Sequence, residues 1–276
     1  MTRLNVIETL PASERRGVIV ALPGLGESAD CLTHTARHWA ERGFRVLAID
    51  PRGHGGSPRW TVPLLSRHPG DVIVEDILAT LEQLAIGSDD RLVLFGHSAG
   101  GAAAAAVAAA VAARVDAVVL EDPFWRLPVT PFQDRDVALA LAANLTRLKA
   151  MSDRERRAEI LGIFPAWPED ELAAWSRSKE EMDVALVENG DVIPSHPWPS
   201  LVQDLADARV PVAVITGTIR IGITANHRAI LRSLGADVTV VPGATHFIRR
   251  DVRPLFHDLV DRFLDQHVPG GAISPL

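Results

Sequence analysis

Short apolar runs alternate with longer segments of helical spacing along most of the chain, and this alternation restricts the possible folds more than any other feature. The runs are rich in β-branched residues and comprise 17–22, 44–49, 91–95, 116–120, 210–215 and 237–241. Nearly continuous apolar strands with helices between them are typical of a parallel sheet that is covered by helices on both faces. The sequence therefore predicts an α/β protein with six core strands.

The connections between these runs carry apolar residues at helical spacing, which predicts helices there. The expected helices are 29–42, 71–84, 99–113, 226–234 and 253–267. The stretch from Gly100 to Ala113 is nearly all alanine and is shorter than the roughly 20 apolar residues that cross a bilayer. Because alanine favours a helix and has little bulk, this stretch predicts a buried helix close to the sheet rather than a membrane span.

The regular alternation stops after Leu120 and resumes at Val210. The segment between them is rich in proline, and short helices joined by proline turns are expected there. We therefore assign residues 1–122 and 201–276 to an α/β core and residues 123–200 to a helical cap.

Four of the six tryptophans lie in the cap segment, at Trp125, Trp167, Trp175 and Trp198. They can form the core of the cap itself or line an apolar pocket over a site, and the two interpretations are compatible. For the pocket we select Phe124, Trp125 and Trp198, which lie at the two ends of the segment.

Charge and cysteine content limit the possible partners and location. A formal charge of −7 argues against nucleic acid as a partner. Cys31 is the only cysteine, so the chain forms no internal disulfide, and a buried structural role is expected for it. Residues 1–16 contain five charged side chains and lack the apolar stretch of a signal peptide. We expect a cytoplasmic protein without a membrane partner, and the sequence does not define its oligomeric state.

The sequence Gly96-His97-Ser98-Ala99-Gly100 matches the pattern G-x-S-x-G, directly after an apolar strand and directly before a helix. The glycines permit a sharp turn that lifts the Ser98 hydroxyl out of the sheet. The helix N-terminus behind it favours negative charge that develops on a substrate oxygen. This arrangement predicts that Ser98 is a nucleophile.

With this motif, the chain resembles the α/β-hydrolase superfamily over residues 17–120 and 210–267. The segment Asp50-Pro-Arg-Gly-His-Gly-Gly-Ser57 is similar to the family's D-x-R-G-x-G-x-S loop, in which side chains, including that of His54, are expected to shape the loop. The resemblance implies an α/β-hydrolase fold, with a mostly parallel, doubly covered sheet and a helical cap inserted after the family's sixth-strand position.

The resemblance also implies the partners of the nucleophile. The backbone amides of Leu25 and Ala99 correspond to the family's oxyanion hole, and Pro23 stands where a histidine is common. His246 follows the last core strand, at the position of the family's general base. We expect the remaining histidines in helices and polar turns to be solvated; these are His34, His38, His68, His227, His257 and His267.

The catalytic acid is less defined, because the segment after 210–215, where many relatives carry it, has no carboxylate. Some relatives place the acid after the strand that precedes the cap, where this chain has Glu121 and Asp122. We favour Asp122, with Glu121 as the alternative. Strand side chains alternate between faces, so only one of the two is expected to reach His246.

Ser98 stands where dehalogenases and epoxide hydrolases of the family carry Asp, and the chain lacks the tyrosines that the latter use. No metal or nucleotide motif is present, so no metal and no cofactor are expected. The prediction is a serine hydrolase that cleaves an ester or lactone of a small, largely apolar molecule. The alternatives are a carbon-carbon bond hydrolase of a vinylogous diketone and a non-catalytic receptor for a small ligand.

Overall fold

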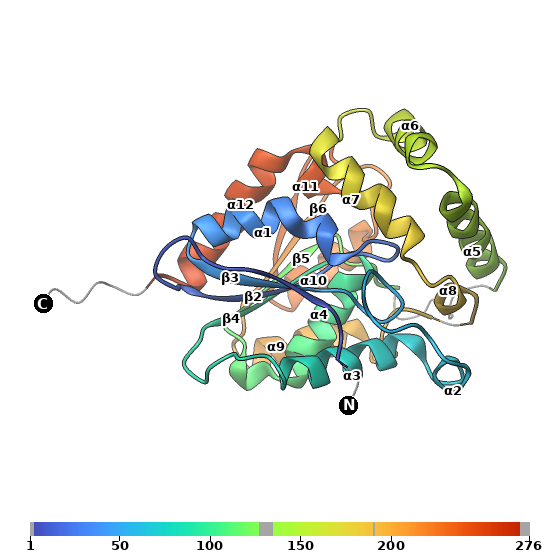
Figure 1. The fold of residues 1–276 in the computed structure, drawn as a ribbon. Helices are drawn as coiled ribbons and strands as arrows, with labels where there is room; N and C mark the ends of the chain where they lie inside the picture. The colour runs from blue at the N-terminus through green and yellow to red at the C-terminus, as the bar shows by residue number, and fades with distance from the viewer. Residues whose placement is uncertain (1–2, 127–134, 190, 271–276) are drawn as a thin grey trace, which may run out of the picture.

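A seven-stranded sheet forms the centre of the molecule in the computed structural model, which describes residues 3–126, 135–189 and 191–270 (Figure 1). The strands are β1 (Val6–Thr9), β2 (Gly17–Leu22), β3 (Phe44–Ile49), β4 (Leu92–His97), β5 (Ala117–Glu121), β6 (Val212–Thr216) and β7 (Asp237–Val240). Their order across the sheet is β1-β3-β2-β4-β5-β6-β7. All neighbours are parallel except β1, which pairs antiparallel with β3.

The sequence prediction of six strands was one strand short, because it missed β1. This strand has only four residues, and three of them are partly exposed rather than buried. As an edge strand it has one neighbour, so it lacks the continuous apolar run that marks the central strands. The six predicted strands all form, and β3 has the predicted bounds, Phe44–Ile49.

Two layers of helices cover the sheet, and each layer packs on alternate side chains of the strands (Figure 1). In β2, Val18, Val20 and Leu22 belong to one buried cluster, while Ile19 and Ala21 belong to the other. The first face is covered by α3 (Pro69–Leu81), α4 (Ala99–Ala110), α9 (Trp198–Asp207) and α10 (Ala225–Ser233). The opposite face is covered by α1 (Thr33–Glu41), α11 (Ile248–Asp251) and α12 (Arg253–His267). The short elements η1 (Ala29–Leu32), α2 (Val62–Leu65) and η2 (Ala112–Arg114) lie in the connections.

Helix α4 contains the alanine-rich stretch and is buried as predicted. Nine of its twelve residues are buried. Its first turn lies so close to the core that a Cβ on Gly100 would be 2.2 Å from the carbonyl oxygen of Pro23. Only glycine fits there, and the close approach fixes the helix N-terminus against the end of β2. No helix in the described residues is long and apolar enough to span a membrane.

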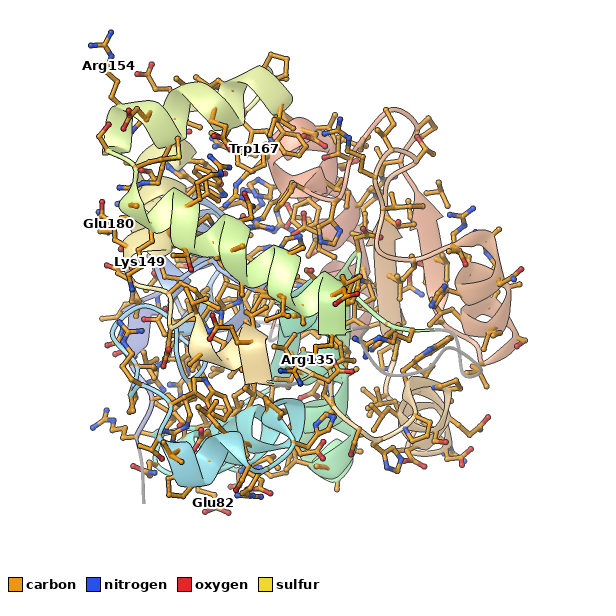
Figure 2. The ribbon with its side chains drawn as sticks, turned by 90° about the vertical axis from the view of Figure 1, so that its right-hand side faces the viewer. Glu82, Arg135, Lys149, Arg154, Trp167 and Glu180 are labelled. Atoms are coloured by element: carbon orange, nitrogen blue, oxygen red, sulfur yellow. The ribbon has the colours of Figure 1, made fainter. Side chains whose placement is uncertain are left out.

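Among the described residues, the connection from β5 to β6 carries five helices, and the first four lie together beyond the carboxyl ends of the strands (Figure 1). They are α5 (Arg135–Ala150), α6 (Asp153–Ile163), α7 (Glu169–Glu180) and α8 (Ala185–Asn189). Figure 2 views this end, with Arg135 and Lys149 marking the two ends of α5. The strand numbered sixth in the family is thus fifth in chain order here. Residues 127–134 and 190 of the predicted cap lie outside the described residues, and the last residues of the predicted range begin α9, which packs on α4.

Two of the cap tryptophans form a small core of their own. Trp167 and Trp175 are buried with Ile160 and Leu172, and their rings pack edge to face. Phe247, from the loop before α11, packs against Trp167. This contact joins the cap to the core on the side where the sequence places His246.

Candidate active site

Ser98 lies in the turn between β4 and α4, at the carboxyl end of the sheet. Its φ of 55° and ψ of −122° fall in a backbone region that non-glycine residues rarely adopt. The turn is held from both sides, because the Ser98 amide donates to the carbonyl of Glu121 at 3.0 Å and its carbonyl accepts from the Phe124 amide at 3.0 Å. The side chain is only partly buried. The structure thus holds a hydroxyl on a strained, fixed turn that solvent can reach.

Asp122 and His246 are in direct contact. The Nδ1 of His246 donates to Oδ2 of Asp122, which is fully buried, while 19% of the His246 side chain is exposed. The Asp122 carboxylate also accepts from Thr216 Oγ1 at 2.6 Å and from the amide of Gly222 at 2.5 Å. Both partners belong to the end of β6 and its following loop, where the family's usual acid is missing. This chain therefore uses that loop to hold a carboxylate that comes from β5.

Glu121 points away from this pair, to the opposite side of the sheet. Its carboxylate accepts from the backbone amide of Arg249 at 2.8 Å and from the guanidinium of the same residue at 2.7 Å. The two carboxylates point apart as expected, but strand alternation is not the whole reason, because β5 ends at Glu121 and Asp122 follows it with a left-handed φ of 39°. Asp122 reaches His246 and Glu121 does not.

His97 connects the Ser98 turn to the His246 loop. Its buried ring donates from Nε2 to the carbonyl oxygen of His246 at 3.0 Å, and the two rings lie 4.8 Å apart. Burial, together with the charge of Arg249, lowers the pKa of His97, which favours the neutral ring. Within the described residues, no hydrogen bond joins the Ser98 hydroxyl to the imidazole of His246. Hydrogen bonds of this kind often form only when substrate is bound.

Leu25 and Ala99, the predicted oxyanion donors, line the same small pocket next to Ser98. Leu25 is flanked by two glycines, and Gly26 adopts a left-handed φ of 74°. A Cβ on Gly24 would lie 2.8 Å from Nδ1 of His97, so the loop passes tightly over the elbow. The structure therefore places Leu25 and Ala99 in one pocket. The backbone of the Leu25 loop lies close to the turn that carries Ser98.

The loop from Asp50 to Ser57 packs against the segment that follows β2 and carries Leu25. Asp50 accepts from the amides of Ala29 at 2.6 Å and Gly56 at 2.9 Å, and the Ser57 hydroxyl donates to the Asp50 carbonyl at 2.6 Å. In the same loop, Arg52 forms a two-point ion pair with Asp76. These contacts agree with the shaping role that the sequence suggested for the loop.

His54 of this loop contacts the oxyanion segment directly. Its Nε2 accepts from the amide of Gly26 at 3.1 Å, and its Nδ1 donates to the carbonyl of Arg52 at 3.2 Å. Burial lowers the pKa of His54 to about 4, so the ring is neutral at pH 7. The neutral tautomer with a proton on Nδ1 is the one that can accept from Gly26.

The three predicted pocket residues occupy different environments. Trp125 and Trp198 are buried in the main core, where their rings stack at 4.9 Å, and Trp198 Nε1 donates to the carbonyl of Arg126 at 2.7 Å. Phe124 is 42% exposed and lies beside Ser98 through its backbone. The burial of the two tryptophans is explained by core packing, and a pocket role for the three residues stays a prediction.

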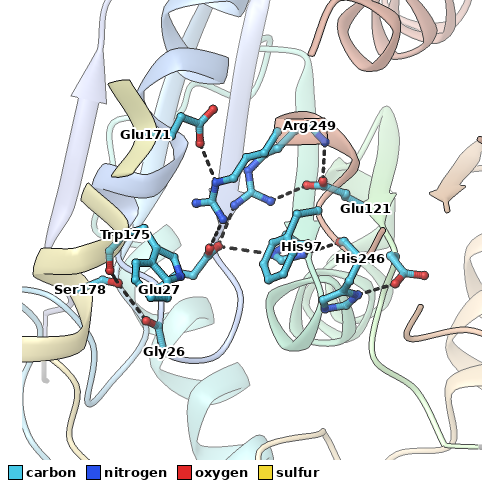
Figure 3. A network of polar contacts seen from close by, with 12 residues as sticks. Gly26, Glu27, His97, Glu121, Glu171, Trp175, Ser178, His246 and Arg249 are labelled. Carbon is cyan, nitrogen blue, oxygen red and sulfur yellow. Dashed lines mark hydrogen bonds and ion pairs between the residues drawn. The ribbon is translucent and has the colours of Figure 1, made fainter. Parts of the chain in front are cut away.

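A buried network of ion pairs lies behind the site, and sequence reasoning missed it (Figure 3). Glu27 contacts the guanidinium groups of both Arg249 and Arg250. Arg249 continues to Glu121, and Arg250 continues to Glu171 of α7 at 2.7 Å. Although burial alone would raise the pKa of Glu27, the charges of the two arginines hold it well below its usual range.

The network is buried at its centre and continues toward the surface through Arg253, which contacts Glu171 at 3.0 Å. The five side chains that form its centre are at most 4% exposed, and each charge faces an opposite charge. Arg250 also stacks on the ring of Trp167 at 4.5 Å, so the network ties the cap to the core. In the described residues, no three His, Cys, Asp or Glu side chains gather in a way that could hold a metal ion.

Comparison with known sequences identifies relatives among hydrolases. Residues 13–160, more than half of the 276, match the family described as serine aminopeptidase, S33. The chain is 34% identical over 115 residues to a monoacylglycerol lipase of Mycolicibacterium smegmatis. This match covers 41% of this chain and 40% of the lipase. The chain spans only 35% to 40% of the length of the curated relatives that it matches.

Two solved structures share the fold over nearly the whole chain. E-2-(acetamidomethylene)succinate hydrolase superposes with a TM-score of 0.73 at 21% identity and covers 95% of both chains. The enol-lactonase from Burkholderia xenovorans LB400 has a TM-score of 0.71 at 22% identity, over 95% of this chain and 96% of that chain. At such identity these matches show the fold alone, and they confirm the predicted doubly covered sheet with its inserted helices.

Proposed function

The chain belongs to the serine aminopeptidase S33 family of α/β-hydrolases, and from this premise we propose that it is a serine hydrolase of a carboxylic ester or lactone in a small, largely apolar molecule. The observation that carries the proposal is the contact between His246 and the buried Asp122, in a loop that His97 links to the strained elbow of Ser98. The chain order of nucleophile, acid and base is that of the α/β-hydrolases.

In the proposed reaction, the Ser98 hydroxyl attacks the carbonyl carbon while Nε2 of His246 accepts its proton. Asp122 keeps the imidazole in the tautomer with a proton on Nδ1 and stabilises the imidazolium that forms. The amides of Leu25 and Ala99 stabilise the negative oxygen of the tetrahedral intermediate. The imidazolium then protonates the leaving alkoxide, and a water molecule activated by His246 releases the acid from Ser98.

The names of two similar proteins are consistent with ester or lactone cleavage. One relative is named a monoacylglycerol lipase, and one structural neighbour is named an enol-lactonase. A carbon-carbon bond hydrolase of a vinylogous diketone uses the same nucleophile and is the second candidate. Turnover of aryl esters and lactones without turnover of such diketones would separate the two.

The nucleophile is tested by Ser98→Ala, which removes one oxygen atom and little packing. We expect the variant to fold normally and kcat to fall by several orders of magnitude, on the order of 10⁶-fold as for other catalytic serines. A fluorophosphonate probe should label the wild-type chain covalently and leave the variant unlabelled. Failure to label the wild-type chain would instead favour a non-catalytic receptor on the same fold.

A further inference from the structure

One backbone carbonyl in the oxyanion loop is contacted by two cap side chains. The oxygen of Gly26 lies 2.9 Å from the hydroxyl of Ser178 and 2.5 Å from Nζ of Lys179, both on α7 (Figure 3 shows Ser178 and Gly26). The Ser178 hydroxyl is also 2.7 Å from the carbonyl of Trp175 and has a single proton for the two acceptors. Lys179 is therefore the principal donor to Gly26.

Lys179 is an unusual residue to find at this place, because only 5% of it is exposed. Its ammonium group lies 4.7 Å from the ring centre of Trp175, on the same helix. Burial lowers the pKa of Lys179 to about 8, while the nearby carboxylate of Glu27 opposes this shift. A buried ammonium group is costly unless it has partners, and here the partners are a carbonyl, an aromatic ring and the field of Glu27.

The other polar group of Gly26 is fixed from the opposite direction. Its amide donates to Nε2 of His54, which belongs to the loop after β3. Gly26 has a left-handed φ, so its peptide planes cannot be held by the ordinary preference of an L residue. The core thus holds the amide and the cap holds the carbonyl of the residue that follows Leu25, the proposed oxyanion donor.

We propose that Lys179, assisted by Ser178, is a positioning residue that the cap supplies to the oxyanion hole. The carbonyl of Gly26 lies two peptide units beyond the Leu25 amide, so Lys179 fixes the loop that presents this amide rather than the amide's own peptide. The site is completed only when α7 is docked. This inference rests on the proposed serine hydrolase function, because it assigns a role within the same reaction. Ion pairs of Glu27 and Glu171 dock the same helix but do not contact Gly26.

The test is Lys179→Met, which keeps the long apolar stem and removes the charge and the donors. Lys149→Met is the matched control, since Lys149 also donates to a backbone carbonyl, that of Met182 at 2.9 Å, but within the cap. We expect Lys179→Met to lower kcat for an aryl ester roughly 10-fold to 100-fold with little change in KM, less than loss of a direct oxyanion donor. Lys179→Arg should recover most of kcat, and Lys149→Met should leave both constants unchanged.

The rate of covalent labelling by a fluorophosphonate probe gives a second readout that does not depend on the substrate chosen. It should fall with kcat in Lys179→Met and stay at the wild-type value in Lys149→Met. A folded Lys179→Met chain that is labelled and turns over at the wild-type rate would overturn the inference and leave the proposed function intact. An equal loss in Lys149→Met, or no recovery in Lys179→Arg, would also overturn it, because the loss would then reflect cap packing.

Two further outcomes are informative. If Lys179→Met does not fold, Lys179→Gln provides the same test. Its shorter polar side chain loses the contact with the Gly26 carbonyl without placing an apolar group beside it. A wild-type kcat in Lys179→Gln would contradict the inference. If the wild-type chain is not labelled at all, the proposed function fails and this inference fails with it.

Discussion

Glu121 and Asp122 are consecutive carboxylates at the end of β5, but they belong to two different polar regions. Asp122 joins the open pair with His246, in which one partner is partly exposed to solvent. Glu121 joins the buried network through Arg249, which also pairs with Glu27, and these three side chains are at most 3% exposed. The same type of side chain thus contributes to the proposed active site on one side and to a buried ion-pair network on the other.

The comparison teaches that burial alone does not mark a catalytic acid. Both carboxylates are fully buried, and Glu121 has the stronger positive partner. What distinguishes Asp122 is that its partner, His246, is partly exposed to solvent and can change its charge. The arginine partner of Glu121 stays protonated at all relevant pH values, so it cannot accept a proton from a nucleophile.

The largest expected effect that tests this comparison is on Asp122. Asp122→Asn keeps the shape of the side chain and removes the acceptor charge that stabilises the imidazolium form of His246. We expect kcat to fall by about 10⁴-fold, as for the triad acid of serine proteases, while Glu121→Gln keeps kcat within about tenfold. Steady-state kinetics on one aryl ester checks both. Retention of near-wild-type kcat in Asp122→Asn would remove Asp122 from the mechanism.

The next effect concerns the buried network, where we expect a lower free energy of unfolding rather than a lower kcat. Glu121→Gln leaves the guanidinium of Arg249 without one of its two carboxylates in a fully buried place. Breaking a buried ion pair costs about 3–5 kcal/mol, and urea denaturation of this variant should show a loss of that size. A loss below about 1 kcal/mol would mean that the pair of Glu121 with Arg249 contributes little to stability.

The smallest effect comes from His54, which links the core loop to the oxyanion segment. Its pKa is lowered by burial to about 4 in the folded chain, against 6.5 for an unperturbed histidine. Below pH 6.5 the unfolded chain therefore binds a proton that the folded chain does not bind, so stability falls as the pH falls from 6.5 to 4. At pH 5 this loss is about 2 kcal/mol.

His54→Gln should remove this part of the pH dependence, because glutamine does not titrate and its amide oxygen can accept from Gly26. The comparison is the difference in unfolding free energy between pH 7 and pH 5 for the two chains. His97 also has a lowered pKa and contributes to the slope in both, so only the difference between the slopes is attributed to His54. Equal slopes would show that His54 is protonated in the folded chain well above pH 4.

Much of the fold follows from patterns that are local in the sequence. Buried parallel strands are continuous apolar runs, and the elbow glycines mark the turn at Ser98, so both could be predicted. The edge strand β1 could not, because it pairs on one side and carries no such run. The prediction that His227 and His257 are solvated was wrong, because both are buried. Which face of a helix packs on the core depends on the fold, and a histidine alone does not indicate that face.

The site itself was predicted in part. Sequence alternation indicated that Glu121 and Asp122 point apart, but which one meets His246 depends on where the loop after β7 returns over the sheet. The buried network could not be predicted, because Glu27 and Arg249 are 222 residues apart in the chain and only the fold brings them together. Lys179 gave no local signal either, since a lysine near the end of an amphipathic helix is ordinarily solvated.

The order of the strands has a consequence for how the molecule is made. From β4 to β7 the strands follow one another across the sheet in chain order, so a chain that grows from its N-terminus can add each new strand to the free edge. Ser98 is synthesised first, Asp122 follows with β5, and the cap comes before His246. During synthesis Ser98 therefore lacks its proposed base until β7 and the loop that carries His246 have been added.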